Sequence, residues 1–188
     1  MPNLFDLLIM ALFGGTVLLS FMGGLGKVFS TLAGMYGGTL LAAWFYRPFT
    51  DLVLAKFFPQ MNAFTGNLVA FLLLLFLTSL SIAIALGRNF TLQRLSQRAG
   101  VINNLTGGVL GLVVAIFATI LSTMITSLLL QVLNATASLG LSPTMYGVQL
   151  ELTNSTLVPL FLRLAPAIVL PLRPFLPQGI PPILASGF

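Results

Sequence analysis

The chain contains no cysteine and no histidine among its 188 residues. Without cysteine it can form no disulfide, iron–sulfur cluster or thiolate centre. Without histidine it has no His-ligated haem, none of the usual zinc sites and no histidine acid–base catalysis. No cofactor is therefore expected to be covalently held or ligated by His or Cys, and no metal site is expected. The ligand classes that stay open are lipid, carotenoid and quinone.

Charged residues are also scarce: eight Lys and Arg with three Asp and Glu make up 6% of the chain, whereas 57% is hydrophobic. A soluble domain carries about 25% charged residues, so these few could not cover a water-soluble fold. The bilayer is therefore the expected solvent for most of the chain. The formal net charge of +5 comes from residues that form no basic run. This pattern indicates topology determinants and lipid-headgroup contacts, and argues against nucleic acid as a partner.

Four apolar stretches are long enough to cross a hydrocarbon core of about 30 Å as helices, at about 1.5 Å per residue. Each of the first three is followed by glycine or proline together with a basic residue, as expected where a helix ends at a membrane–water boundary. The sequence therefore predicts an all-α polytopic membrane protein with a four-helix transmembrane domain at residues 1–133. The predicted transmembrane helices are 4–22, 28–46, 64–86 and 105–133.

Two polar connections predict segments that lie on the membrane surface. Residues 49–63 mix apolar side chains with two charges, and predict a short interfacial helix or re-entrant turn that ends near Pro59. Residues 89–102 predict a short amphipathic helix with Arg94 and Arg98 on one face.

Residues 134–188 change character, because seven prolines lie between Pro159 and Pro182. Proline at this density does not suit a lipid-facing helix that spans the bilayer. The apolar stretch 161–170 is short and is interrupted by Pro166. We therefore predict an interfacial helix followed by an extended proline-rich tail that leaves the bilayer.

Two pairs of glycines four residues apart indicate helix-packing faces, because small residues let two helix backbones approach closely in a membrane. The pairs are Gly34 with Gly38 and Gly107 with Gly111. They lie in the second and fourth predicted helices, so the sequence predicts that these two helices pack together through their glycines.

The distribution of basic residues predicts the orientation of the chain. The connections after the first and third predicted helices carry four of them, and the connection after the second carries two. Because basic residues favour the cytoplasmic side, we expect the first and third connections inside and both termini outside. The four residues expected to determine topology and contact lipid headgroups are Lys27, Arg88, Arg94 and Arg98, against Arg47 and Lys56.

The chain offers little for catalysis. Its carboxylates are Asp6, Asp51 and Glu151, and none lies in the middle of an apolar segment, where an ionisable group would indicate an ion path. Asn3 and Asp6 fit a variant capping box at the start of the first helix, a structural role. No nucleotide-binding loop, metal cluster or nucleophile–base pair is present, so no enzyme is predicted. Hydroxyl side chains on the fourth helix are expected to bond to carbonyls of their own helix: Ser122, Thr123 and Thr126.

Three sequence features occur in a fixed order along roughly residues 1–165. They are Asn3-Leu-Phe-Asp6 followed by Gly24 and Lys27, then Gly100-x2-Asn103-Asn104-Leu-Thr-Gly107-x3-Gly111, then Asn154-Ser155-Thr-Leu-Val-Pro159. Together with the four-segment layout, this pattern resembles the colicin V production protein (CvpA-like) family. The residues that carry the family motif are Asp6, Gly24, Asn103 and Asn104.

The chain departs from the family pattern at two places. The family's Asp-Arg pair is Asn103-Asn104 here, so a role of that charge pair does not carry over. The usual arginine-rich first turn is glycine-rich, with the single cation Lys27. The resemblance implies a bacterial inner-membrane protein, linked to colicin V export and envelope functions, with no established enzymatic activity.

Three hypotheses follow. The first is a non-enzymatic inner-membrane protein that acts through contacts with lipid or with other membrane proteins, including copies of itself. The second is an accessory or structural subunit of a larger respiratory or photosynthetic membrane complex, docked through the small-residue faces. The third is a small transporter or channel, which would need a polar path through the helices, and the sequence shows none.

Overall fold

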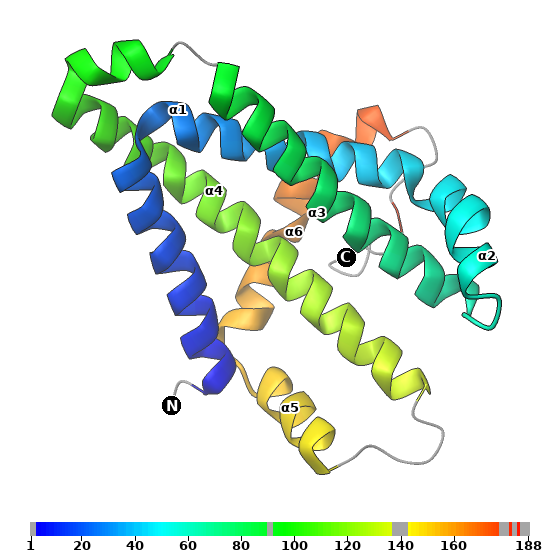
Figure 1. The fold of residues 1–188 in the computed structure, drawn as a ribbon. Helices are drawn as coiled ribbons and strands as arrows, with labels where there is room; N and C mark the ends of the chain where they lie inside the picture. Colours follow the sequence, from blue (N-terminus) through cyan, green and yellow to red (C-terminus); the bar gives the residue numbers. More distant parts are fainter. Residues whose placement is uncertain (1–2, 90–91, 137–142, 177–180, 182–183, 185–188) are drawn as a thin grey trace.

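The computed structural model describes residues 3–89, 92–136, 143–176, 181 and 184, and within these ranges the elements are helices without strands (Figure 1). The helical fold predicted from the sequence is confirmed. The elements in chain order are α1 (Leu4–Phe49), the π-helical η1 (Thr50–Leu54), α2 (Ala55–Phe57), α3 (Ala63–Asn89), α4 (Leu92–Thr136), α5 (Pro143–Thr153), α6 (Leu157–Leu172) and the 3₁₀ turn η2 (Arg173–Phe175).

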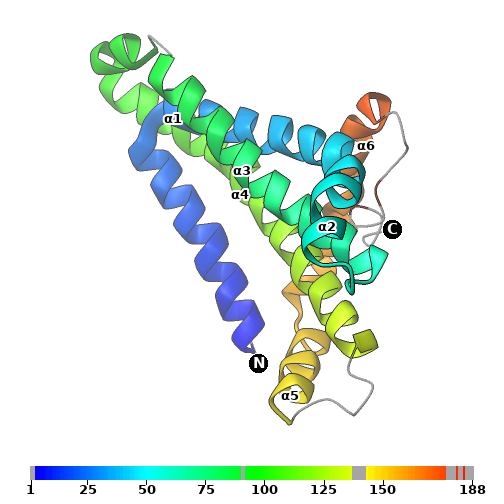
Figure 2. The ribbon, with the colours of Figure 1, turned by 45° about the vertical axis from the view of Figure 1, so that its right-hand side comes forward.

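A sharp bend divides α1 into a first arm, residues 4–23, and a second arm, residues 25–49 (Figures 1 and 2). The bend is at Gly24, whose φ of 70° and ψ of 173° suit a residue without a Cβ. The two arms correspond to the first two predicted transmembrane helices. The glycine-rich turn predicted between them is thus a bend at one residue.

Among the described residues, four helical stretches are long and apolar enough to cross a membrane, which confirms the predicted class. They are Leu4–Phe57, Ala63–Arg88, Gly100–Val132 and Leu157–Phe175. Their positions differ from the prediction in one respect. Both arms of α1 belong to the first stretch, and the fourth lies in the proline-rich region, which was expected to leave the bilayer.

The helix α6 runs through Pro166 and Pro171, where an extended chain was predicted. Each proline removes only one helical hydrogen bond, and the packed face of α6 offsets that loss. Phe161, Ala165 and Val169 on this face are buried, and α6 packs mainly against α4. The prediction was wrong because it treated the whole circumference of the segment as facing lipid.

The connection between α1 and α3 begins as a helix, formed by η1 and α2. This helical part ends at Phe57, just before Pro59. The predicted end near Pro59 is therefore confirmed. Of the predicted amphipathic stretch 89–102, residues 92–102 belong to α4, which bends at Gly100 with a φ of 37°; Asn89 ends α3, and residues 90–91 lie outside the described residues.

The core lies along the second arm of α1, because α1 packs against both α3 and α4, which run in opposite directions (Figures 1 and 2). Phe71 of α3 and Phe117 of α4 are almost fully buried there. The rings of Tyr36 and Phe117 lie 4.7 Å apart between their centroids. At the far end of the second arm, Trp44 Nε1 donates a hydrogen bond of 2.7 Å to the carbonyl of Phe175, which holds η2 against α1.

Candidate functional site

The N-terminus of α1 carries the predicted capping box. The Asp6 backbone N–H donates to the Asn3 side-chain oxygen at 3.0 Å, and the Asn3 backbone N–H donates to the Asp6 carboxylate at 3.2 Å. These bonds satisfy backbone donors that have no acceptor within the helix. They also fix the Asp6 side chain in the buried interface between α1 and the C-terminal helices.

The Asp6 carboxylate also binds the start of α6. Ser155 Oγ donates to one carboxylate oxygen at 2.6 Å, and the backbone N–H groups of Thr156 and Leu157 donate to the same oxygen at 3.1 and 3.0 Å. The Thr156 hydroxyl donates to the second oxygen at 3.2 Å. Because all these partners can donate to it, an ionised carboxylate fits the surroundings, although Asp6 is only 1% exposed.

The backbone donors at the start of α6 are thereby satisfied. Asp6 accepts from Thr156 and Leu157, and Ser155 Oγ accepts from the Val158 N–H at 3.1 Å. Pro159 has no N–H to satisfy. The segment from Ser155 to Pro159 is thus a helix cap whose charged acceptor comes from the other end of the chain.

The end of α5 joins the same place (Figure 1). The Leu4 backbone N–H donates to the Glu151 carboxylate at 3.1 Å, and the Asn3 side-chain amide donates to the Glu151 carbonyl. We call this set of Asn3, Asp6, Glu151, Ser155 and Thr156 the three-helix junction. Two of the three carboxylates of the chain are bound in it. Since both Asp6 oxygens accept hydrogen bonds, the junction fixes three helix ends.

A second set of contacts, between α1 and α4, stabilises the bend of α1. The Leu25 backbone N–H, left without a helical acceptor by the bend, donates to Asn103 Oδ1 of α4 at 3.1 Å. A Cβ on Gly24 would collide with the Asn103 side chain. A Cβ on Gly107 would lie 2.8 Å from the Gly24 carbonyl carbon, closer than real Cβ contacts. The motif residues of the first turn and of α4 therefore contact each other directly.

The other small-residue faces pair differently from the prediction. A Cβ on Gly34 would lie 2.7 Å from the carbonyl oxygen of Ser79, and one on Gly38 would lie 2.8 Å from the Ser79 Cα, so this face packs on α3. Gly111 packs against Ser20 in the first arm of α1. The predicted packing of the second and fourth segments through their glycines is wrong. A small-residue face shows that a helix approaches closely but does not show which one.

The predicted topology residues lie mostly at one end of the molecule. Lys27, just beyond the α1 bend, and Arg88, near the end of α3, are both exposed. These two places lie at the same end in Figures 1 and 2. Arg94 and Arg98 belong to the first part of α4, and their side chains lie outside the described part of the structure. Asn104 is half-buried on α4 and follows the bend-capping asparagine.

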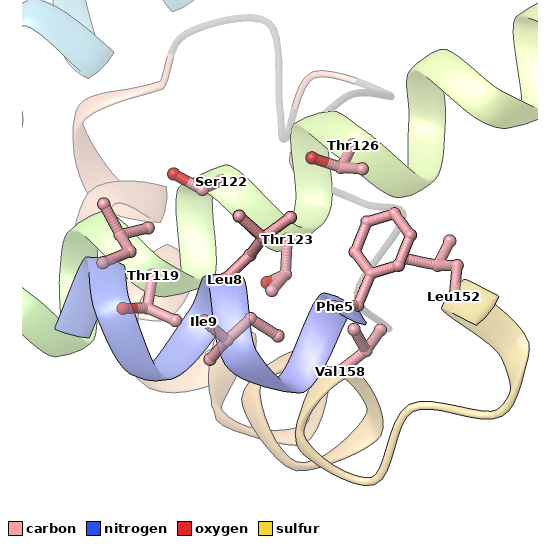
Figure 3. A pocket seen from close by; sticks show the side chains of 10 residues that line it. Phe5, Leu8, Ile9, Thr119, Ser122, Thr123, Thr126, Leu152 and Val158 are labelled. Carbon is pink, nitrogen blue, oxygen red and sulfur yellow. The ribbon is translucent and has the colours of Figure 1, made fainter. Parts of the chain in front are cut away.

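A cavity of about 110 Å³ lies between the first arm of α1, α4 and the α5–α6 region (Figure 3). One wall is apolar, and the other is a row of hydroxyl side chains on α4 with helical spacing. Thr123 Oγ1 donates to the Ile120 carbonyl at 2.8 Å, as the sequence predicted for this row. Thr119 is fully buried, and its hydroxyl has no hydrogen-bond partner among the described residues. The row consists of Thr119, Ser122, Thr123 and Thr126.

We expect Thr119→Val to raise the unfolding free energy by about 1 kcal/mol, because it removes a buried hydroxyl without a protein partner. Thr123→Val is the matched control on the same helix face, and it should lower stability slightly because its hydroxyl is bonded. Thermal unfolding in mild detergent measures both variants. A larger loss for Thr119→Val than for Thr123→Val would contradict the assignment.

Sequence reasoning missed three features of these sites. It assigned Asp6 to its own helix, but the bond to Ser155 joins residues 149 positions apart. It gave Glu151 no partner, and it passed over Thr119 in the hydroxyl row. Two capping patterns in the sequence could have indicated the bond between Asp6 and Ser155. One is an acidic residue at the start of the first helix, and the other is a Ser-Thr pair before a proline at the start of a later helix.

The family model described as "Colicin V production protein" matches residues 5–166 of the chain. The matched range begins just before Asp6 and ends within α6, so it includes the carboxylate of the three-helix junction and the helix start that this carboxylate caps. No curated protein matches the chain, and no solved structure matches it.

Proposed function

The chain belongs to the colicin V production protein family, and we propose that it is a non-enzymatic protein of the bacterial inner membrane that acts by binding lipid or other membrane proteins. The family is not known as an enzyme family. The chain is a multi-pass membrane protein, with helices that can cross a bilayer. What it binds within the bilayer is then the central question.

The observation that carries this proposal is an open apolar groove of about 580 Å³ between the second arm of α1, α3 and α4. Its walls are mostly aliphatic and aromatic, and exposed Phe76 and Leu80 stand at its edge. A groove of this composition on the outside of a membrane domain can take apolar chains from the surrounding bilayer. It favours binding as the function, since its lining includes no ionisable residue that could act in catalysis.

Purification from native membranes in mild detergent, with mass spectrometry of what is retained, tests the proposal. We expect the protein to retain lipid or a defined membrane protein, and to give no ion or solute flux in liposomes above that of empty vesicles. Flux above that background would replace the proposal with a transporter. Stoichiometric retention of the subunits of a respiratory or photosynthetic complex would assign the chain to that complex instead.

The orientation is a further part of this proposal. The α1 bend and the end of α3 lie at one end and the N-terminus at the other (Figures 1 and 2). We propose that the end with Lys27 and Arg88 faces the cytoplasm and that the N-terminus faces outward. Because the chain has no cysteine, a single introduced cysteine is its only thiol, and labelling of that thiol shows on which side of the membrane the position lies.

We expect an impermeant maleimide to label Leu4→Cys in intact spheroplasts and to label Leu25→Cys only after lysis. Both positions are exposed, at 61% and 37% respectively, so labelling depends on the side and not on burial. The reverse pattern would invert the proposed orientation.

A further inference from the structure

The groove has the length of one bilayer leaflet. Its α3 wall runs from Leu72 to Ala83, which at 1.5 Å per residue is about 16 Å, or half of a hydrocarbon core of about 30 Å. Leu75 and Leu121 form a buried inner wall, whereas Phe76 and Leu80 are exposed at the open side. A chain that enters sideways from the bilayer can therefore lie along the groove within a single leaflet.

A second, smaller pocket adjoins the groove at the end near the α1 bend. It has a volume of about 270 Å³ and lies between the two arms of α1, with Lys27 and the hydroxyl residues Thr16, Ser20 and Thr31 in its lining. Thr31 is in the lining of both this pocket and the groove, so the two spaces are neighbours on either side of this residue. We call the smaller space the Lys27 pocket.

The charge of the Lys27 pocket is uncompensated within the chain. Asp6 and Glu151 are bound in the three-helix junction, and Asp51 lies beyond the far end of the second arm. In the described ranges, which include every carboxylate side chain of the sequence, no ion pair involves Lys27. A cation beside hydroxyl groups at a membrane–water boundary attracts an anionic headgroup.

The volume of the groove suits an alkyl chain better than a whole helix. A helix of 10–12 Å diameter and about 16 Å length fills more than about 1,200 Å³, which exceeds the groove. A flexible alkyl chain is much narrower. The apolar groove and the cationic pocket beside it therefore suit an amphiphile with an acyl chain and an anionic head.

We propose that this protein binds one anionic phospholipid, with an acyl chain in the groove between α1, α3 and α4 and with its phosphate on Lys27. The proposal rests on the proposed function and names the ligand. The acyl chain supplies the buried apolar contact, and Lys27 selects the charge of the headgroup. Ser20 is in the same lining and adds a hydroxyl group to the Lys27 pocket.

The test is native mass spectrometry of the purified full-length chain with added phosphatidylglycerol or phosphatidylcholine. We expect one phosphatidylglycerol adduct on the wild type, bound about fivefold or more tightly than phosphatidylcholine, as one cation near a membrane surface gives. Lys27→Gln should abolish this preference, and Lys27→Arg should keep it. Lys56→Gln is the matched control, because it removes an exposed lysine elsewhere and should change nothing.

A bulky residue in the groove separates the contribution of the chain from that of the headgroup. Ala118 lines the groove and is half-buried, so Ala118→Phe should weaken the binding of both lipids while leaving the ratio of their affinities unchanged. Equal affinity for the two lipids in the wild type, or an unchanged preference in Lys27→Gln, would overturn the lipid assignment and leave the proposed function standing. A wild type that retains neither lipid nor a protein partner would overturn both.

Discussion

Asp6→Ala lowers the thermal unfolding midpoint in detergent by roughly 10 °C, as we expect from the loss of a shared acceptor at two helix starts. The carboxylate accepts from Asn3, Ser155, Thr156 and Leu157, and it is nearly inaccessible. Without it, several donors stay buried without an acceptor, which costs more than the bonds themselves contribute. The start of α6 should then loosen from α1.

Asp51→Ala is the matched control for this prediction, because Asp51 is an exposed carboxylate on η1. It should leave the midpoint almost unchanged. Ser155→Ala should have a smaller effect than Asp6→Ala, and the double variant should lose less than the sum of the two single changes, since both act in one network. Additive losses, or equal losses for Asp6→Ala and Asp51→Ala, would show that the junction does not hold the fold together.

Gly24→Ala is the second change with a large expected effect. At a φ of 70° and a ψ of 173° any side chain is strained, and here it would also meet the Asn103 amide. We expect a loss of about 3 kcal/mol in unfolding free energy, and a weaker contact between α1 and α4 at the bend. The yield of monodisperse protein and its unfolding midpoint measure this loss.

Gly23→Ala provides the control one residue away. A Cβ on Gly23 would lie 3.5 Å from the Lys27 side chain, an ordinary van der Waals contact, and Gly23 has helical backbone angles. Alanine should therefore be tolerated there, or even stabilise the helix. If Gly23→Ala and Gly24→Ala behave alike, the bend does not depend on the backbone conformation of Gly24.

The sequence predicted the features that depend on short stretches of chain. The capping box of Asn3 and Asp6 follows from residue types three positions apart, and the bend at Gly24 follows from a cluster of glycines. Apolar length alone predicted an all-α membrane protein, although it missed the stretch Leu157–Phe175. These inferences needed no knowledge of which helix lies beside which.

The features that the sequence could not predict depend on contacts between distant segments. The residues around Asp6 do not show that it accepts a hydrogen bond from Ser155. The start of α1 and the start of α6 each carry a capping pattern that needs no partner from elsewhere in the chain. The sequence predicted that the glycines of the second arm pack against those of α4. In the structure, the glycines of the second arm pack on Ser79 of α3, and Gly107 of α4 packs on the α1 bend. The helical course of α6 through Pro166 required its packing against α4, which proline content does not reveal.

Native mass spectrometry of the wild-type chain, released directly from its own membrane, tests most directly the claim that this protein works by binding. The account predicts that the chain emerges with a bound lipid or a second polypeptide, and that the bound mass survives gentle activation. A bare chain as the only species under the mildest conditions that release it would contradict the account.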